Sequence, residues 1–274
     1  MRYPVAVAGE PVLDSAARAE LRRAVRLLEG DRLTRQITAL LGRVASGGAR
    51  FGANWAGRFL PGDAIAAAQD AAAVALRAAL SAATWRLGPR RWAAPRWWPA
   101  ATVAMTGAAG GAAGLPGTFA ELPATTTLLL REIARIAAEE GEDLETDAAR
   151  AECLTVFGLG GAGEGGYYAA RLALADVLGR TIGRSIGDAL PRLVAAVAAR
   201  FGVPVAWKVA GQAIPIAGAV AGASMNAMFM EHFRARARGH FTVRRLERRY
   251  GAGVVQAAYE AERAAFSGSH ASAL

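Results

Sequence analysis

The chain has 274 residues, of which 53% are hydrophobic, and its formal net charge is +9. Its length allows one large domain or two small ones, and its single cysteine, Cys153, excludes an intrachain disulfide and a disulfide-stapled scaffold. The apolar part of the N-terminus is too short, and acids follow it too soon, for a signal peptide, so we expect a cytoplasmic protein.

Abundant alanine favours helices, and no convincing run of alternating β-branched residues indicates a strand. We predict an all-α, multi-helix single domain, divided into N-terminal helices (1–60), a main helical domain (61–266) and a frayed tail (267–274). The first helix, residues 14–29, is amphipathic and carries four arginines around its apolar face. This helix and the next two, at 33–44 and from Asp63 to about Gly88, are interpreted as scaffold.

Residues 85–98 hold four tryptophans, four arginines and no acid, and the stretch 97–120 is uncharged. Such a block before an uncharged stretch is typical of a chain that approaches a membrane interface. It is equally typical of a loop that covers a buried helix, with arginine stacked on indole.

The middle of the chain contains ordinary helix signals. Pro123 is predicted to open a helix that Gly141 ends, and Thr146 is predicted to cap the next one. After a glycine-rich break at 158–166, a long helix carries Tyr167 and Tyr168. The break contains the GxGxxG spacing of dinucleotide sites, but no second βαβ unit accompanies it, so a loop between helices is favoured.

Residues 204–251 contain eight basic and two acidic side chains, so they contribute +6 to the net charge. The first part is an uncharged glycine-rich stretch, and the second part is dense in arginine. Gly239 is predicted to break the helix, with Thr242 capping the one that follows. Asn226 is polar among apolar residues, so we predict that it is buried and hydrogen-bonded to another segment.

Small residues at helical spacing occur in both glycine-rich stretches, where they allow another backbone to approach closely. We therefore predict that the two stretches pack against each other. The glycines of this contact are Gly107, Gly110, Gly111, Gly114, Gly218 and Gly222.

Two motifs carry a family resemblance. The C-terminal region resembles the signature of the EcsC family in the segments IPIAGAVAGASMN and RGHFTVRRLERRYG, and residues 105–117, MTGAAGGAAGLPG, resemble its central motif. The resemblance covers the chain from roughly Trp85 onward. It implies a bacterial protein often encoded near an ABC transporter, in a family without established catalytic residues. The implied function is therefore a non-enzymatic, membrane-associated accessory protein with ABC transporter subunits as partners.

The two basic blocks predict binding to an anionic membrane surface, peripherally at the inner face of the cell membrane. The alternatives are insertion of the uncharged stretches into the bilayer, and a solvated face whose arginines pair with acids such as Glu231 and Glu247. The predicted membrane-binding residues are Arg90, Arg91, Arg96, Trp97, Trp98, Arg234, Arg236, Arg238, Arg244, Arg245, Arg248 and Arg249.

A competing hypothesis is a hydrolase-type enzyme whose cleft gathers Asn226, His240 and Glu247. No metal-ligand spacing and no nucleophile elbow accompanies these residues, so we expect neither a metal nor another cofactor. Nucleic acid is disfavoured as a partner because no recognised nucleic-acid-binding module accompanies the arginines.

Overall fold

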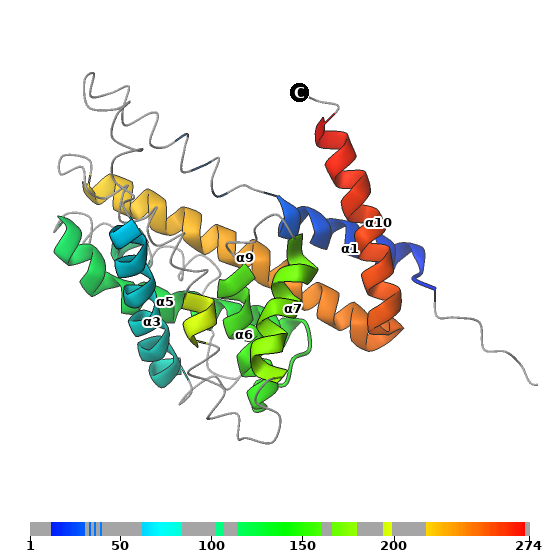
Figure 1. The fold of residues 1–274 in the computed structure, drawn as a ribbon, viewed down its shortest axis with the longest axis horizontal. Coiled ribbons are helices and arrows are strands. Elements are labelled where there is room, and N and C mark those ends of the chain that lie inside the picture. The colour runs from blue at the N-terminus through cyan, green and yellow to red at the C-terminus, as the bar shows by residue number, and fades with distance from the viewer. Residues whose placement is uncertain are drawn as a thin grey trace, which may run out of the picture.

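The computed structural model describes residues 12–30, 62–83, 104–106, 114–159, 166–179, 194–198 and 218–271, together with Leu33, Gln36, Ala39 and Thr102. Every regular element in these residues is a helix, and they contain no strand (Figure 1). The prediction of an all-α, multi-helix fold is confirmed. The predicted helix at 33–44 lies mostly outside these residues.

Helix α1 (Ser15–Glu29) is the predicted amphipathic N-terminal helix. Its N-cap is Asp14, whose Oδ1 accepts a hydrogen bond of 2.7 Å from a backbone N–H in the first turn. Leu21, Val25 and Leu28 are buried. This apolar face packs against the C-terminal half of the longest described helix, α9 (Figure 1).

Helix α9 (Gly218–Tyr250) corrects the prediction of a break at Gly239. The helix runs through Gly239, and Thr242 lies inside it instead of capping a second helix. A Cβ on Gly239 would lie 2.6 Å from Cγ of Leu28. The glycine is therefore used for the close approach of α1 to α9, because it has no side chain to separate the two helices.

Replacing Gly239 with leucine is expected to lower the free energy of unfolding by about 1–3 kcal/mol, because the new side chain overpacks the contact with Leu28. Urea unfolding measures this change. The matched control is Gly253→Leu, at an exposed position where a Cβ would meet no atom within 4 Å. Equal stability of the two variants would contradict the close approach.

Helix α5 (Gly114–Glu139) starts well before Pro123, so the prediction that Pro123 opens this helix is wrong. A proline inside a helix removes one backbone hydrogen bond, and here the flanking turns are held by packing against α9 and against α3 (Gly62–Ala83). The end of α5 is as predicted. Gly141 has φ +81°, and Glu142 N donates to Ala137 O at 2.9 Å.

The described part of the chain also contains α6 (Asp147–Leu159), α7 (Gly166–Gly179) and α10 (Ala252–Ala271), together with short helical pieces at 104–106 and 194–198. Thr146 caps α6 as predicted, since its Oγ1 accepts from Ala149 N at 3.3 Å. Helix α10 continues into the segment 267–274 that the sequence assigns to a frayed tail.

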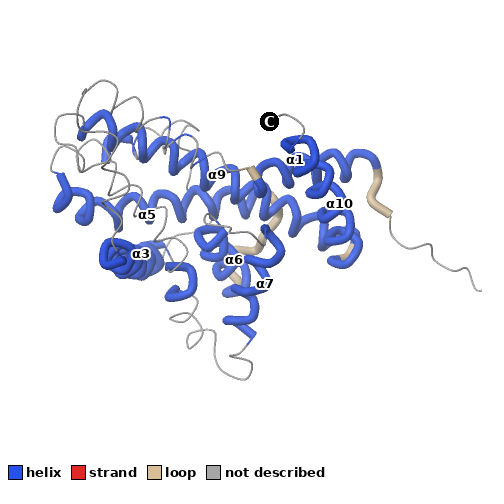
Figure 2. Tube along the Cα trace, turned by 45° about the horizontal axis from the view of Figure 1, so that its top comes forward, coloured by secondary structure: helices blue, strands red, loops and turns tan. Residues whose placement is uncertain are grey.

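The buried residues form two hydrophobic cores along α9. The larger core joins α3, α5 and α6 to the N-terminal part of α9 and extends to Phe241. The smaller core joins α1, α7 and α10 to its C-terminal part. Figure 2 shows α5 and α9 lying along each other, with α1 and α10 toward the C-terminal end of α9.

Part of the GxGxxG spacing is explained by packing. Gly158 lies inside α6, and a Cβ there would lie 2.7 Å from Cδ1 of Leu174 on α7. Gly158 therefore serves the contact between two helices. Residues 160–165 lie outside the described part of the chain.

None of the described helices is both long and apolar enough to cross a membrane. The uncharged stretch 97–120, and the uncharged first part of residues 204–251, lie partly outside the described residues.

Candidate functional site

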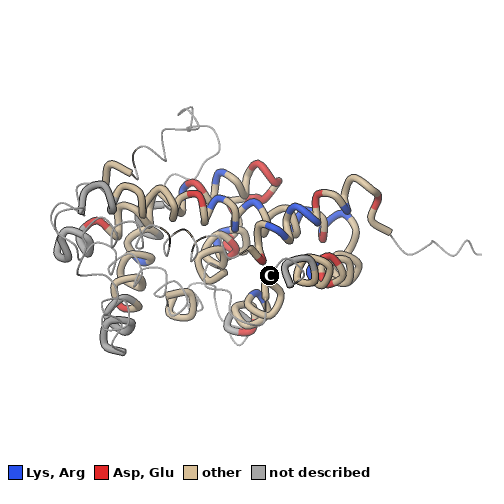
Figure 3. The backbone as a smooth tube through the Cα atoms, turned by 90° about the horizontal axis from the view of Figure 1, so that it is seen from above, with Lys and Arg blue, Asp and Glu red and all other residues tan. Residues whose placement is uncertain are grey.

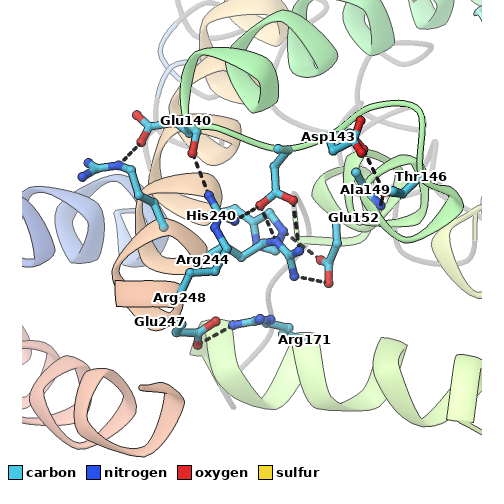
Figure 4. Close-up of polar contacts among 12 residues, drawn as sticks. Glu140, Asp143, Thr146, Ala149, Glu152, Arg171, His240, Arg244, Glu247 and Arg248 are labelled. Carbon is cyan, nitrogen blue, oxygen red and sulfur yellow. Dashed lines mark hydrogen bonds and ion pairs between the residues drawn. The ribbon is translucent and has the colours of Figure 1, made fainter. Parts of the chain in front are cut away.

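His240 is at the centre of a hydrogen-bonded network between α6, α7 and α9. Its side chain is completely buried. Nδ1 lies 2.9 Å from the hydroxyl oxygen of Tyr167, and Nε2 lies 2.9 Å from Oε2 of Glu152. Figure 4 shows His240 and Glu152 together with the arginines that surround them.

The surroundings of Tyr167, His240 and Glu152 determine which of these side chains carry a proton. Burial alone would raise the pKa of Glu152, but the hydrogen bond from His240 and the positive charge of Arg244 lower it to about 2. Burial lowers the pKa of His240 and raises that of Tyr167. Glu152 is therefore an ionised acceptor for Nε2–H of a neutral His240, and the Tyr167 hydroxyl donates to Nδ1.

Arg244 connects this network to the loop after α5. Its guanidinium donates to Glu152 Oε1 at 2.6 Å and to both carboxylate oxygens of Glu142, at 2.8 and 3.1 Å. Arg248, one turn further along α9, also donates to Glu142 and to the backbone oxygen of Glu140. These two arginines fasten the α5–α6 loop to α9.

Glu247 belongs to the same region through α7. Arg171 donates to its Oε1 at 2.7 Å, and the hydroxyl of Tyr168 donates to the same oxygen at 2.9 Å. The Arg171 guanidinium also lies 3.5 Å from the Tyr167 hydroxyl. His240 is therefore linked to Glu247 indirectly, through Tyr167 and then Arg171. No hydrogen bond between His240 and Glu247 is among those of the described residues.

Most of the α9 arginines predicted to bind a membrane contact acids of the same chain. Arg234 donates to Glu132 at 2.7 Å, and Arg245 bridges Glu140 on one side and Glu20 of α1 on the other. Arg236 is buried. In contrast, Arg238 and Arg249 are exposed. Figure 3 shows basic and acidic positions side by side along the C-terminal half of α9.

Asn226 lies in a second polar cluster, between α5 and the N-terminal part of α9. It is completely buried, and its Nδ2 donates to Glu121 Oε1 at 2.7 Å. Thr125 donates to the same carboxylate oxygen, and Thr106 lies 3.5 Å from the Asn226 amide. The prediction that Asn226 is buried and bonded to another segment is confirmed.

The hypothesis of an enzyme cleft requires Asn226, His240 and Glu247 to meet. Asn226 and His240 are 14 residues apart on one continuous helix, which separates them by about 21 Å along its axis. Their described contacts belong to different clusters. Within the described residues, no three histidine, cysteine or acidic side chains gather into a possible metal site.

Several predicted site residues cannot be placed. Gly107, Gly110, Gly111, Arg90, Arg91, Arg96, Trp97 and Trp98 lie outside the described residues. Gly114 begins α5, and Gly218 and Gly222 lie in the first turns of α9. Contacts next to these glycines join the segments that carry the two glycine-rich stretches: Thr106 contacts Asn226, and α5 packs against α9.

Sequence reasoning missed four members of the network: Glu142, Glu152, Tyr167 and Arg171. They lie in three neighbouring segments within residues 142–171, far along the chain from His240, and each has a side chain that is common on ordinary helices and loops. No local pattern marks them, because their roles depend on how α6 and α7 pack against α9.

Comparison with known proteins identifies a family. The profile of the EcsC protein family matches residues 98–246, more than half of the chain. No curated protein and no solved structure matches the chain. The matched residues include α5, α6, α7 and most of α9, so they contain the Asn226 cluster and His240 with Glu142, Glu152 and Arg244. Glu247, Arg248, α1 and α10 lie outside the match.

Proposed function

The chain belongs to the EcsC protein family, and from this premise we propose that it is a non-enzymatic accessory protein on the inner face of the cell membrane. It associates with the membrane peripherally, through electrostatic attraction to anionic lipid. Its protein partners are ABC transporter subunits, as the resemblance of its motifs implies.

The distribution of charge between the interior and the surface supports this proposal. The side chains of Glu132, Glu142 and Glu247 are 2%, 6% and 12% exposed, and each is bound by at least one arginine. These acids are therefore neutralised within the fold and do not offset the other arginines of the chain, whose formal net charge is +9. An excess of exposed arginine attracts anionic headgroups by about 1 kcal/mol for each residue near the surface.

The structure changes which α9 arginines are suited to this role. Arg234, Arg244 and Arg245 hold other segments of the fold, so moving them to a bilayer would break these ion pairs. Arg238 and Arg249 are exposed and can meet a membrane without such a cost. The Arg90–Trp98 block remains a proposed part of the same surface.

Vesicle co-sedimentation tests the proposal. We expect the protein to sediment with vesicles that contain phosphatidylglycerol and not with vesicles of phosphatidylcholine alone. Raising the salt from about 0.1 M to about 1 M should release it, because the Debye length falls from about 10 Å to about 3 Å. Equal binding to both lipids, or no binding to either, would overturn peripheral electrostatic association.

A further inference from the structure

We propose that the outward face of α1 is the surface that docks on the anionic bilayer. This face, called here the α1 basic face, consists of Arg18, Arg22, Arg23 and Arg26, and all four residues are exposed. The inference rests on the proposed function and extends it to a specific surface. The α1 basic face lies outside the residues matched by the family profile and outside both basic blocks identified in the sequence.

The acids of α1 are bound to other helices, whereas its four arginines are exposed. Glu20 accepts from Arg245 at 2.9 Å. Glu29 accepts from the Tyr259 hydroxyl at 2.7 Å and from the backbone N–H of Tyr167 at 3.1 Å. Both acidic side chains of the helix are thus paired with groups of neighbouring helices, and Glu20, which is 39% exposed, is neutralised by Arg245.

An acid of α10, Glu262, lies beside this face, and the exposed N-cap Asp14 lies four residues before Arg18. Glu262 forms an ion pair of 2.9 Å with Arg22, whose side chain is still 55% exposed. The hydrogen bond from Arg22, helped by the charges of Arg18 and Arg26, lowers the pKa of Glu262. Three arginines therefore surround one carboxylate, which leaves an excess of positive charge on this part of the surface.

The geometry suits an extended anionic surface. The four arginines lie within nine consecutive positions of one helix, so the distance from the first to the last is about 12 Å along its axis. Val12, two residues before the N-cap Asp14, is 72% exposed and adds an apolar side chain near the start of this helix. A basic face with an adjacent exposed apolar residue fits a bilayer surface better than it fits a purely polar partner.

Docking of this face does not require α1 to enter the bilayer. An amphipathic helix that inserts uses its apolar face, but Leu21, Val25 and Leu28 of α1 are already buried against α9 and its neighbours. The helix can therefore contact headgroups through its arginines while the fold stays intact. Binding of this kind is reversible and depends strongly on salt.

The test compares two triple variants with equal loss of charge. The first is Arg18→Gln, Arg23→Gln and Arg26→Gln, which keeps the ion pair of Arg22; the second is Arg90→Gln, Arg91→Gln and Arg96→Gln. Partition onto phosphatidylglycerol vesicles is measured at low salt, and circular dichroism and urea unfolding confirm that both variants are folded. We expect the first variant to lose about 100-fold in partition, and the second to lose at least tenfold less.

The outcomes separate this inference from the proposed function. If wild-type protein binds anionic vesicles and the α1 variant binds as tightly, the α1 basic face is not the docking surface, although peripheral association stands. If both variants lose binding equally, the α1 basic face is not the main docking surface, and this inference is overturned. If wild-type protein does not bind anionic vesicles, the proposed function fails, and this inference fails with it. Salt-sensitive binding of the wild type to duplex DNA without vesicle binding would give the face a different partner and would also overturn the proposal.

Discussion

Replacing Glu152 with alanine is expected to lower the free energy of unfolding by about 2 kcal/mol, within the cost of leaving a buried hydrogen-bonding group unsatisfied. Glu152 accepts from His240 Nε2 and from Arg244. Arg244 keeps both of its bonds to Glu142 in the variant. In contrast, one ring nitrogen of the fully buried His240 loses its partner. Urea and thermal unfolding measure the loss.

A series of variants shows whether the effect comes from this network. Glu152→Gln keeps an acceptor for His240 and removes the charge, so it should lose less than the alanine variant. The matched control is Glu145→Ala, at an exposed position in the loop before α6, where the expected change is within about 0.5 kcal/mol. A Glu152→Ala variant as stable as this control would show that the network contributes little to stability.

Replacing Asn226 with leucine is expected to lower the free energy of unfolding by about 2 kcal/mol, because the Glu121 carboxylate loses a close donor inside the core. Leucine has a similar size, so the loss is mainly that of the hydrogen bond. Asn226→Asp should be worse at neutral pH, since it places a second carboxylate 2.7 Å from the first.

A double variant makes this prediction specific to the pair. Removing both partners of a buried hydrogen bond costs less than removing one, so Glu121→Leu should recover part of the stability lost by Asn226→Leu. Gln256→Leu on the exposed side of α10 is the control for exchanging an amide for leucine. If the Glu121→Leu change adds its full cost to that of Asn226→Leu, the two residues are not coupled.

Local patterns in the sequence determined the helices and several of their ends. The alanine content and the period of the apolar residues predicted helices throughout. Asp14, Gly141 and Thr146 act at helix ends through bonds to backbone groups a few residues away, which is why such ends can be predicted from local sequence. The burial of Asn226 was predictable for a related reason, because a lone amide in an apolar stretch must find a partner.

The tertiary structure decided the roles of Gly239, Pro123 and the arginines. A glycine at position 239 favours a helix break by its local preference. However, Leu28, more than 200 positions earlier in the chain, packs against Gly239, so the glycine is a contact point between two helices. Arg244 and Arg245 resemble Arg18 and Arg23 in the sequence, yet the first two bind acids from other segments and the last two are exposed. Whether an arginine is exposed or bound to an acid depends on which helix packs beside it. Because those neighbours come from distant parts of the chain, only the packed fold distinguishes an arginine that holds helices together from one that can meet a membrane.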